Sequence, residues 1–189
     1  MTTPRVRLGG RNELGVTNWV LSRVASRSVG VSTANLFATL GRTGGVFRGW
    51  LFYSATMMPF GPLDRRDTEM IIIRVAHVRE CAYELDHHLR LGRRHGVTVE
   101  MADRIVKRPL FATGGSGSAQ TTSVRSREDV VLDSVDELVT SGHLSDDNWH
   151  ALLRHFDEAK IIGMLLLVGH YSALATVIAA LRIERDPTP

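Results

Sequence analysis

Three side chains capable of acid, base or nucleophile chemistry follow one another at helical spacing near the middle of the chain. Cys81, Glu84 and His88 are separated by three and four residues, so on one α-helix they lie along a single stripe and can point into one pocket. Carboxyl and imidazole groups that are partly buried beside an apolar helix are suitable proton carriers near neutral pH. The spacing therefore predicts a candidate site for acid–base or thiol chemistry.

A fourth titratable group, Glu69, comes twelve residues before Cys81. On one straight helix with about 100° per residue, Glu69 would lie roughly a third of a turn away from the stripe. A bend between Arg79 and Ala82 would bring its carboxylate to the other groups, although that segment contains neither glycine nor proline. Periodicity alone therefore does not place Glu69 in the site.

The elements that must position these groups are helices, because helical signals dominate the chain and strand signals are scarce. Apolar residues recur at spacings of three and four, and Asp, Ser and Thr caps, glycines and the turn at 59–62 mark helix ends. The expected helical segments are 17–29, 34–40, 46–58, a central stretch from Asp64 or Asp67 through His95, 99–107, 128–140, 146–155 and 157–182. The apolar run 70–78 is the expected centre of the core.

Length and composition predict one domain over residues 1–189. The chain is 43% hydrophobic, which is enough to bury one full core. Residues 1–46 are expected to form a helical extension at the N-terminus. The stretch 109–127 contains Gly114-Gly115-Ser116-Gly117-Ser118, and this composition predicts a flexible loop.

Charge and cysteine content exclude several classes of function. The 23 basic and 20 acidic residues are interspersed and give a formal charge of +3, so no basic stripe indicates nucleic-acid binding. The single cysteine excludes an intrachain disulfide and a zinc site made of several thiolates. Together with the lack of a signal-peptide pattern, this predicts a cytoplasmic protein.

One segment, 161–181, is long and apolar enough to cross a bilayer and is flanked by Lys160 and Arg182. His170 near its middle and the many apolar residues elsewhere in the chain favour a buried core or interface helix instead. We therefore expect no membrane partner, and we interpret His170 as a hydrogen-bonded core histidine.

The central segment resembles the signature helix pair of the carboxymuconolactone decarboxylase family, in the order Glu69, Tyr83-Glu84, His88 and Gly96-Val97. Residues 156–181 resemble the closing helix of longer members, so the resemblance spans roughly 47 to 185. It implies an all-α, alkylhydroperoxidase D-like helical bundle that assembles into homo-oligomers. It also implies that Glu69 reaches the pocket, that Tyr83 and His87 contact a small-molecule substrate, and that no cofactor or metal is used.

The two branches of this family imply different chemistry. The alkylhydroperoxidase D-like branch uses a Cys-x-x-Cys pair, a histidine and an upstream glutamate as a thiol relay. Here Cys81 and His88 match that pattern, but Glu84 occupies the place of the second cysteine, so an intramolecular disulfide cannot form. The decarboxylase branch lacks the cysteine pair, and the segment from Tyr83 to His88 resembles it more closely.

The resemblance therefore implies a decarboxylase-like enzyme that acts without cofactor on a small lactone or carboxylic acid. Loss of carbon dioxide leaves an enolate-like charge, for which His88 would be the proton donor, with Glu69 or Glu84 as its partner. One alternative is a peroxiredoxin-type antioxidant activity through Cys81, and another is a non-catalytic helical oligomer. A less favoured alternative is a di-iron site. Glu84-x-x-His87 has the Glu-x-x-His form that di-iron bundles use, and Asp147-x-x-His150 is a looser second copy with aspartate in place of glutamate.

Overall fold

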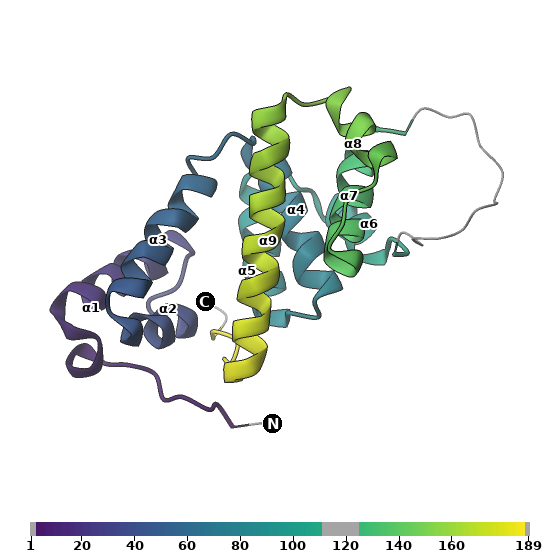
Figure 1. Cartoon of the computed structure of the whole chain (residues 1–189). Coiled ribbons are helices and arrows are strands. Elements are labelled where there is room, and N and C mark those ends of the chain that lie inside the picture. Colours follow the sequence, from purple (N-terminus) through teal and green to yellow (C-terminus); the bar gives the residue numbers. More distant parts are fainter. Residues whose placement is uncertain (1–2, 111–124, 188–189) are drawn as a thin grey trace.

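A computed structural model of the protein describes residues 3–110 and 125–187, and these ranges contain only helices, one short 3-10 turn and loops (Figure 1). The predicted all-α fold is confirmed. Residues 111–124 of the expected Gly/Ser loop lie outside the described part of the chain. The helices are α1 (Arg11–Ser28), α2 (Asn35–Leu40), α3 (Gly45–Met57), α4 (Arg65–Val78), α5 (Ala82–Arg94), α6 (Val99–Lys107), α7 (Arg127–Ser141), α8 (Asp146–Leu153) and α9 (Glu158–Leu181).

Five of these helices begin at a side-chain cap that is visible in the sequence. Asp64, Thr98, Ser126, Ser145 and Asp157 each accept a hydrogen bond from the backbone N–H three residues later. Such a cap satisfies one of the four N–H groups that have no partner in the first turn of a helix. The predicted starts therefore agree with the observed ones to within a residue or two, and α6 matches its prediction at both ends.

Helix α4 forms the centre of the bundle and packs against α5, α6, α7 and α9. In Figure 1, α9 crosses the middle of the molecule, α6 to α8 lie on one side of it, and α1 to α3 lie on the other. The apolar run of α4 is almost completely buried, as expected from its sequence: Met70, Ile71, Ile72, Ile73 and Val75 are at most 1% exposed. Burial of this run supplies much of the hydrophobic free energy of the fold.

Helix α9 is the segment whose length and hydropathy would also suit a membrane span. One of its faces is buried against α4 and α7, with Ile161, Met164 and Leu167 each 1% exposed. Ile162 and Leu166 on the opposite face are about half exposed, at 54% and 48%. In this structure α9 is therefore a helix of the core with one uncovered apolar side.

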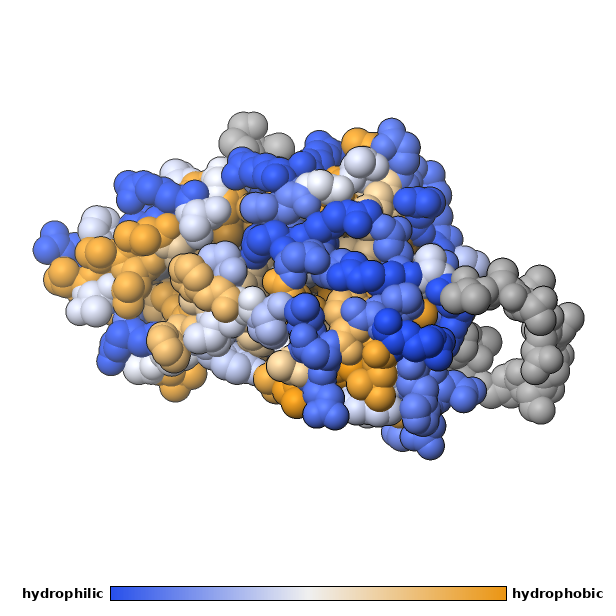
Figure 2. Space-filling model, turned by 90° about the horizontal axis from the view of Figure 1, so that it is seen from above, coloured by the Kyte–Doolittle hydropathy of each residue, from blue (hydrophilic) through white to orange (hydrophobic). Residues whose placement is uncertain are grey.

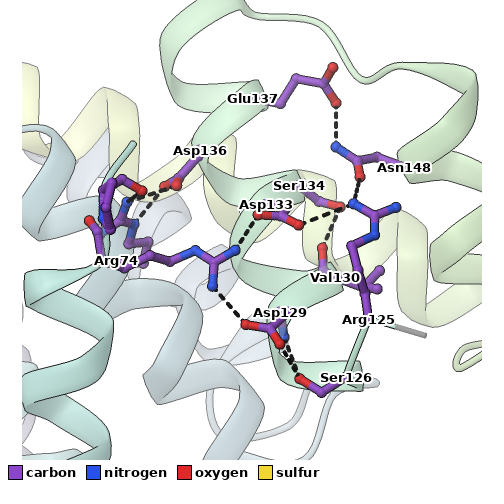
Figure 3. A network of polar contacts seen from close by, with 12 residues as sticks. Arg74, Arg125, Ser126, Asp129, Val130, Asp133, Ser134, Asp136, Glu137 and Asn148 are labelled. Atoms are coloured by element: carbon purple, nitrogen blue, oxygen red, sulfur yellow. Dashed lines mark hydrogen bonds and ion pairs between the residues drawn. The ribbon is translucent and has the colours of Figure 1, made fainter. Parts of the chain in front are cut away.

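A buried ion pair joins α4 to α7. Arg74 Nε and Nη2 donate to Asp136 Oδ1 and Oδ2 over 2.5 and 2.7 Å, and both side chains are fully buried. Arg74 Nη1 also donates to the carbonyl oxygens of Ile105 and Arg108, at the end of α6. A second set of contacts continues along α7, where Asn148 bridges Arg125 and Glu137 (Figure 3). The buried guanidinium of Arg74 on α4 thus binds both α7 and the end of α6.

Helices α1 and α2 pack against each other, and α1, α2 and α3 all contact the 3-10 turn Gly41–Thr43. Apolar side chains remain exposed on the outer faces of α1 and α3. Val16, Val20 and Val24 of α1 and Phe52 of α3 are 44 to 75% exposed. Figure 2 shows hydrophobic residues gathered at the end of the molecule that α1 to α3 occupy. The homo-oligomer expected from the sequence stays a prediction, and this surface is where the chain offers apolar area for it.

Candidate active site

A tight turn between α4 and α5 brings the sequence-predicted groups together. The N–H of Glu80 donates to His77 O, and the N–H of Cys81 donates to Ala76 O over 2.8 Å, which is the double hydrogen bond that closes a helix in a Schellman motif. Glu80 takes the left-handed position of this motif, with φ of 51°. The turn is the bend required to bring Glu69 of α4 next to α5, and it forms here without glycine.

The turn places Glu69, Glu84 and His88 in one cluster. His88 Nδ1 donates to Glu69 Oε2 over 2.7 Å, and His88 Nε2 lies 3.3 Å from Glu84 Oε2. Arg65, one turn before Glu69 on α4, donates from Nη2 to Glu69 Oε1 over 2.6 Å. Two carboxylates therefore flank one imidazole, and a guanidinium partly balances the carboxylate on the Nδ1 side.

This cluster forms part of the wall of a cavity of about 210 Å³ between the α1 to α3 end and helices α5 and α9. Glu84 and His88 line the cavity, whereas Glu69 lies behind His88 and is not part of the lining. Most of the remaining wall is apolar or aromatic: Leu36, Phe37, Trp50, Leu51, Met58 and Leu174. His88 Nε2 is thus the ring nitrogen next to Glu84, which lines the cavity. Nδ1 is bound by Glu69, which lies outside the lining.

His88 is expected to be protonated at neutral pH. Burial of the ring would by itself lower its pKa, but the hydrogen bonds and negative charges of Glu69 and Glu84 outweigh this effect and raise the pKa to about 9. The ring contacts Tyr171 edge to face, with centroids 5.1 Å apart. An imidazolium held between two carboxylates in a mainly apolar wall is a proton donor in the pH range of most cells.

The raised pKa predicts a pH-dependent contribution of His88 to stability. The folded pKa of about 9 is above the reference value of 6.5, so the stabilisation is complete below about pH 6.5 and is lost as pH rises towards 9. Urea unfolding should show the advantage of wild type over His88→Gln shrinking across this interval, by up to roughly 3 kcal/mol. Parallel pH profiles for the two proteins would contradict this protonation state.

Tyr83 and His87, expected to contact substrate, also line the cavity, but their polar atoms have partners within the protein. The Tyr83 hydroxyl and His87 Nε2 both donate to Asp186 Oδ2, over 2.8 and 2.9 Å, and Arg90 Nη2 lies 3.1 Å from His87 Nδ1. Burial and the charge of Asp186 raise the pKa of Tyr83. These two side chains therefore shape the wall with their rings and offer a ligand few free polar atoms.

Asp186 also accepts a hydrogen bond from the backbone N–H of Asn35 at the start of α2, over 2.7 Å. Burial of the Asp186 carboxyl is outweighed by its hydrogen bonds to His87, Asn35 and Tyr83, which lower its pKa. One carboxylate thus connects α2 to α5 beside the cavity.

Cys81 lies at the N-terminal end of α5 rather than within the helix. It precedes α5 as the N-cap residue, with φ of −90° and ψ of 85°, and it is not among the residues that line the cavity. The thiol is buried, and this burial raises its pKa even though the N–H groups of Glu84 and Tyr83 act in the opposite direction. The lining of this cavity therefore includes Glu84 and His88 but not Cys81, and a role for the thiol in the site stays a prediction.

Comparison with known proteins indicates the family and the fold. The sequence model of the Carboxymuconolactone decarboxylase family matches residues 45–121, a range that includes Glu69, Cys81, Glu84 and His88. No match was found among curated protein sequences. A similar solved structure is that of an uncharacterized peroxidase-related protein with an alkylhydroperoxidase AhpD core from Ralstonia eutropha JMP134, with a TM-score of 0.79 and 17% identity over 98% of this chain and 94% of that chain. The fold is alkylhydroperoxidase D-like.

The family resemblance seen in the sequence is thereby confirmed, and other structures share the alkylhydroperoxidase D-like fold. An uncharacterized peroxidase-related protein from Silicibacter sp. TM1040 gives a TM-score of 0.76 at 16% identity, over 98% of this chain and 95% of that chain. The debrominase Bmp8 gives a TM-score of 0.72 at 14% identity, over 95% and 90% of the two chains. At such low identity these likenesses establish the fold alone.

Three groups in or beside the cavity were not predicted from the sequence as site residues: Arg65, His170 and Asp186. Arg65 carries a local signal, because it precedes Glu69 by one helical turn. His170 and Asp186 meet their partners across 116 and about 100 positions of the chain, so no short-range spacing marks them.

The histidines and acids of the possible di-iron motif face different partners. Glu84 contacts His88, whereas His87 contacts Asp186. In ranges 3–110 and 125–187, no three His, Cys, Asp or Glu side chains converge as a metal site requires.

Proposed function

We propose that the protein is a decarboxylase-like enzyme that replaces the carboxylate of a small unsaturated lactone acid, or of a related carboxylic acid, with a proton. The observation that carries this proposal is the position of His88 in the wall of a largely apolar cavity, with its ring held between Glu69 and Glu84. The match to the Carboxymuconolactone decarboxylase family over residues 45–121 supports the same class of reaction.

The proposed reaction is balanced with the groups of this site. Breaking the bond to the carboxylate releases carbon dioxide and leaves the electron pair on the substrate as an enolate-like anion. His88 transfers its Nε2 proton to the substrate carbon and becomes neutral, and solvent returns the proton afterwards. No oxidation or reduction takes place.

The two carboxylates are proposed to have different roles. Glu69 holds Nδ1 of His88 from behind and so fixes the ring and its tautomer. Glu84, which faces the cavity, stabilises the imidazolium before proton transfer. The apolar walls disfavour a compact carboxylate more than the spread charge of the anion that follows it.

Release of carbon dioxide from a panel of five-membered unsaturated lactone acids tests this proposal. We expect turnover by wild type and, because Cys81 lies outside the cavity lining, turnover within about threefold of wild type for Cys81→Ser. A coupled assay for bicarbonate measures both rates. Absence of turnover across the panel would contradict a decarboxylase function.

A second candidate is a thiol-dependent reaction through Cys81, favoured by the likeness to peroxidase-related proteins and to a debrominase. A cysteine-to-alanine variant of that debrominase has been crystallised with 2,3,4-tribromopyrrole, and its structure has a TM-score of 0.71 to this chain at 12% identity, over 98% and 93% of the two chains. In the peroxidase version, the Cys81 thiolate would attack a hydroperoxide to give a sulfenic acid and an alcohol, and two equivalents of external thiol would restore the cysteine.

Burial of Cys81, which raises its thiol pKa, makes this candidate the weaker one. Hydroperoxide consumption with dithiothreitol separates the candidates, because only the thiol reaction requires Cys81. Equal inactivity of wild type and Cys81→Ser would remove the peroxidase candidate. Inactivity in both assays would favour a non-catalytic helical protein.

A further inference from the structure

A second histidine lines the same cavity from a different helix. His170 of α9 is half-buried, and its ring stacks on Trp50 with centroids 5.7 Å apart and an interplanar angle of 25°. Tyr53 contacts the same ring edge to face at 5.4 Å. This aromatic setting fixes the imidazole next to the space that a substrate would occupy, although the reaction proposed above has no use for it.

Hydrogen bonding determines which nitrogen of His170 carries the proton. Ser54 Oγ lies 2.8 Å from the carbonyl oxygen of Trp50 and 3.1 Å from His170 Nε2. A hydroxyl has one hydrogen, and the shorter bond to the carbonyl takes it, so Ser54 Oγ accepts from Nε2–H. Among the described residues, none donates a hydrogen bond to Nδ1, and this nitrogen therefore keeps a free lone pair.

The two histidines of the cavity have opposite electrostatic surroundings. His88 is flanked by two carboxylates, whereas His170 contacts a hydroxyl and aromatic rings. Burial lowers the pKa of His170, and the charge of Glu84 offsets this only in part. Two titratable groups of one cavity whose environments separate their protonation states are the usual arrangement of an acid and a base.

Tyr171 lies between the two imidazoles. Its ring makes edge-to-face contacts with both, at 5.1 Å to His88 and 5.3 Å to His170. Burial raises the pKa of the Tyr171 hydroxyl, so this residue remains neutral between them. A small planar molecule in the cavity can therefore be reached by one imidazole from α5 and by another from α9.

We propose that His170 and His88, which line the same cavity from different helices, act as base and acid on one substrate, so that the protein also isomerises small unsaturated lactones by moving their double bond. His170 Nδ1 removes the proton from the carbon next to the carbonyl, which leaves a dienolate. His88 Nε2 then protonates the γ carbon, which moves the double bond into conjugation with the carbonyl. Solvent takes the proton from His170 and returns one to His88, so the formula of the lactone is unchanged.

This inference rests on the role of His88 as proton donor in the proposed function, but it adds a step that decarboxylation does not need. Loss of carbon dioxide requires only an acid, because no C–H bond is broken. Double-bond migration requires a base as well. The two activities therefore respond differently to the loss of His170.

The test uses α-angelica lactone, a five-membered lactone whose double bond lies in the β,γ position, in D₂O near neutral pD. Proton NMR should show conversion to the conjugated isomer with deuterium at the γ carbon. His170→Gln should slow this conversion about 100-fold or more, the usual effect of losing a general base. His88→Gln should slow it similarly, and His150→Gln, at an exposed position of α8, should match wild type.

A pH profile and a second variant distinguish a base from a merely structural residue. The wild-type rate should fall at acidic pH as His170 becomes protonated, and the residual rate of His170→Gln should lack this fall. Ser54→Ala, which removes the acceptor of Nε2–H, should slow isomerisation about tenfold through loss of positioning. Ser54→Thr, which keeps the hydroxyl, should restore most of that rate.

The outcomes separate this inference from the proposed function. With a lactone acid, His170→Gln should reduce release of carbon dioxide less than tenfold, whereas His88→Gln should reduce it strongly. No isomerisation by wild type, or equal isomerisation by wild type and His170→Gln, overturns the inference whatever happens to decarboxylation. Isomerisation that depends on His170 without any decarboxylation would support it and overturn the proposed function instead.

Discussion

Replacing His88 with glutamine is expected to reduce turnover of a lactone acid by about 100- to 10,000-fold, the range typical of losing a general acid. Glutamine is close to histidine in size and keeps a hydrogen-bond donor, but it cannot transfer a proton at neutral pH. Release of carbon dioxide under single-turnover conditions measures the chemical step directly. His95→Gln, at an exposed position just after α5, is the matched control and should retain wild-type turnover.

A second variant keeps this prediction testable if His88→Gln folds poorly. Glu84→Gln removes one of the two negative charges that raise the His88 pKa while leaving the bond from His88 Nδ1 to Glu69. The alkaline limb of the pH–rate profile should therefore move to lower pH. An unchanged limb in Glu84→Gln, or normal turnover in a folded His88→Gln, would show that the proton donor is a different group.

The largest loss of stability is expected from Asp136→Ala. This change leaves the guanidinium of Arg74, which is fully buried, without its carboxylate, and losing one partner of a buried ion pair typically costs about 3–5 kcal/mol. Urea unfolding followed by circular dichroism measures the free energy of unfolding. Asp103→Ala, which breaks the exposed pair of Asp103 and Lys107, should cost less than about 1 kcal/mol.

A double replacement separates the loss of pairing from the loss of packing. Arg74→Met together with Asp136→Leu removes both charges and keeps apolar volume, and such replacements are often neutral or stabilising. We therefore expect the double variant to be more stable than Asp136→Ala. A free energy of unfolding for Asp136→Ala within about 1 kcal/mol of wild type would contradict this prediction. It would mean that Arg74 gains another partner or contacts water in the variant.

Much of the fold could be predicted because its determinants are local. Caps such as Ser145 and Asp157 act within three residues, and the apolar period of a helix is visible in any short window. The pairing of Glu84 with His88 follows from the same logic, since they lie one turn apart on α5. Most helix boundaries and this part of the site could therefore be predicted from the sequence, whereas α1 begins at Arg11, six residues before its expected start.

The parts that could not be predicted depend on how one residue turns or on which helices meet. Glu80 adopts a left-handed conformation that sequence favours only weakly outside glycine, and this turn ends α4 and makes Cys81 the N-cap residue of α5. From the sequence, His170 is interpreted as an ordinary core histidine. Its place in the cavity wall depends on contacts with Ser54 and Trp50 of α3, which are far from it in the sequence. Such long-range encounters leave no period in the sequence.

The carboxylate of Asp186 implies an order in which the pocket is completed. It joins Asn35 and Tyr83, which precede it by 151 and 103 positions, so these contacts close very long loops and form late if local helices form first. During synthesis on the ribosome, α2 and α5 would be present long before Asp186 emerges. The cavity would thus acquire its final shape only after all of the helices from α1 to α9 had been made.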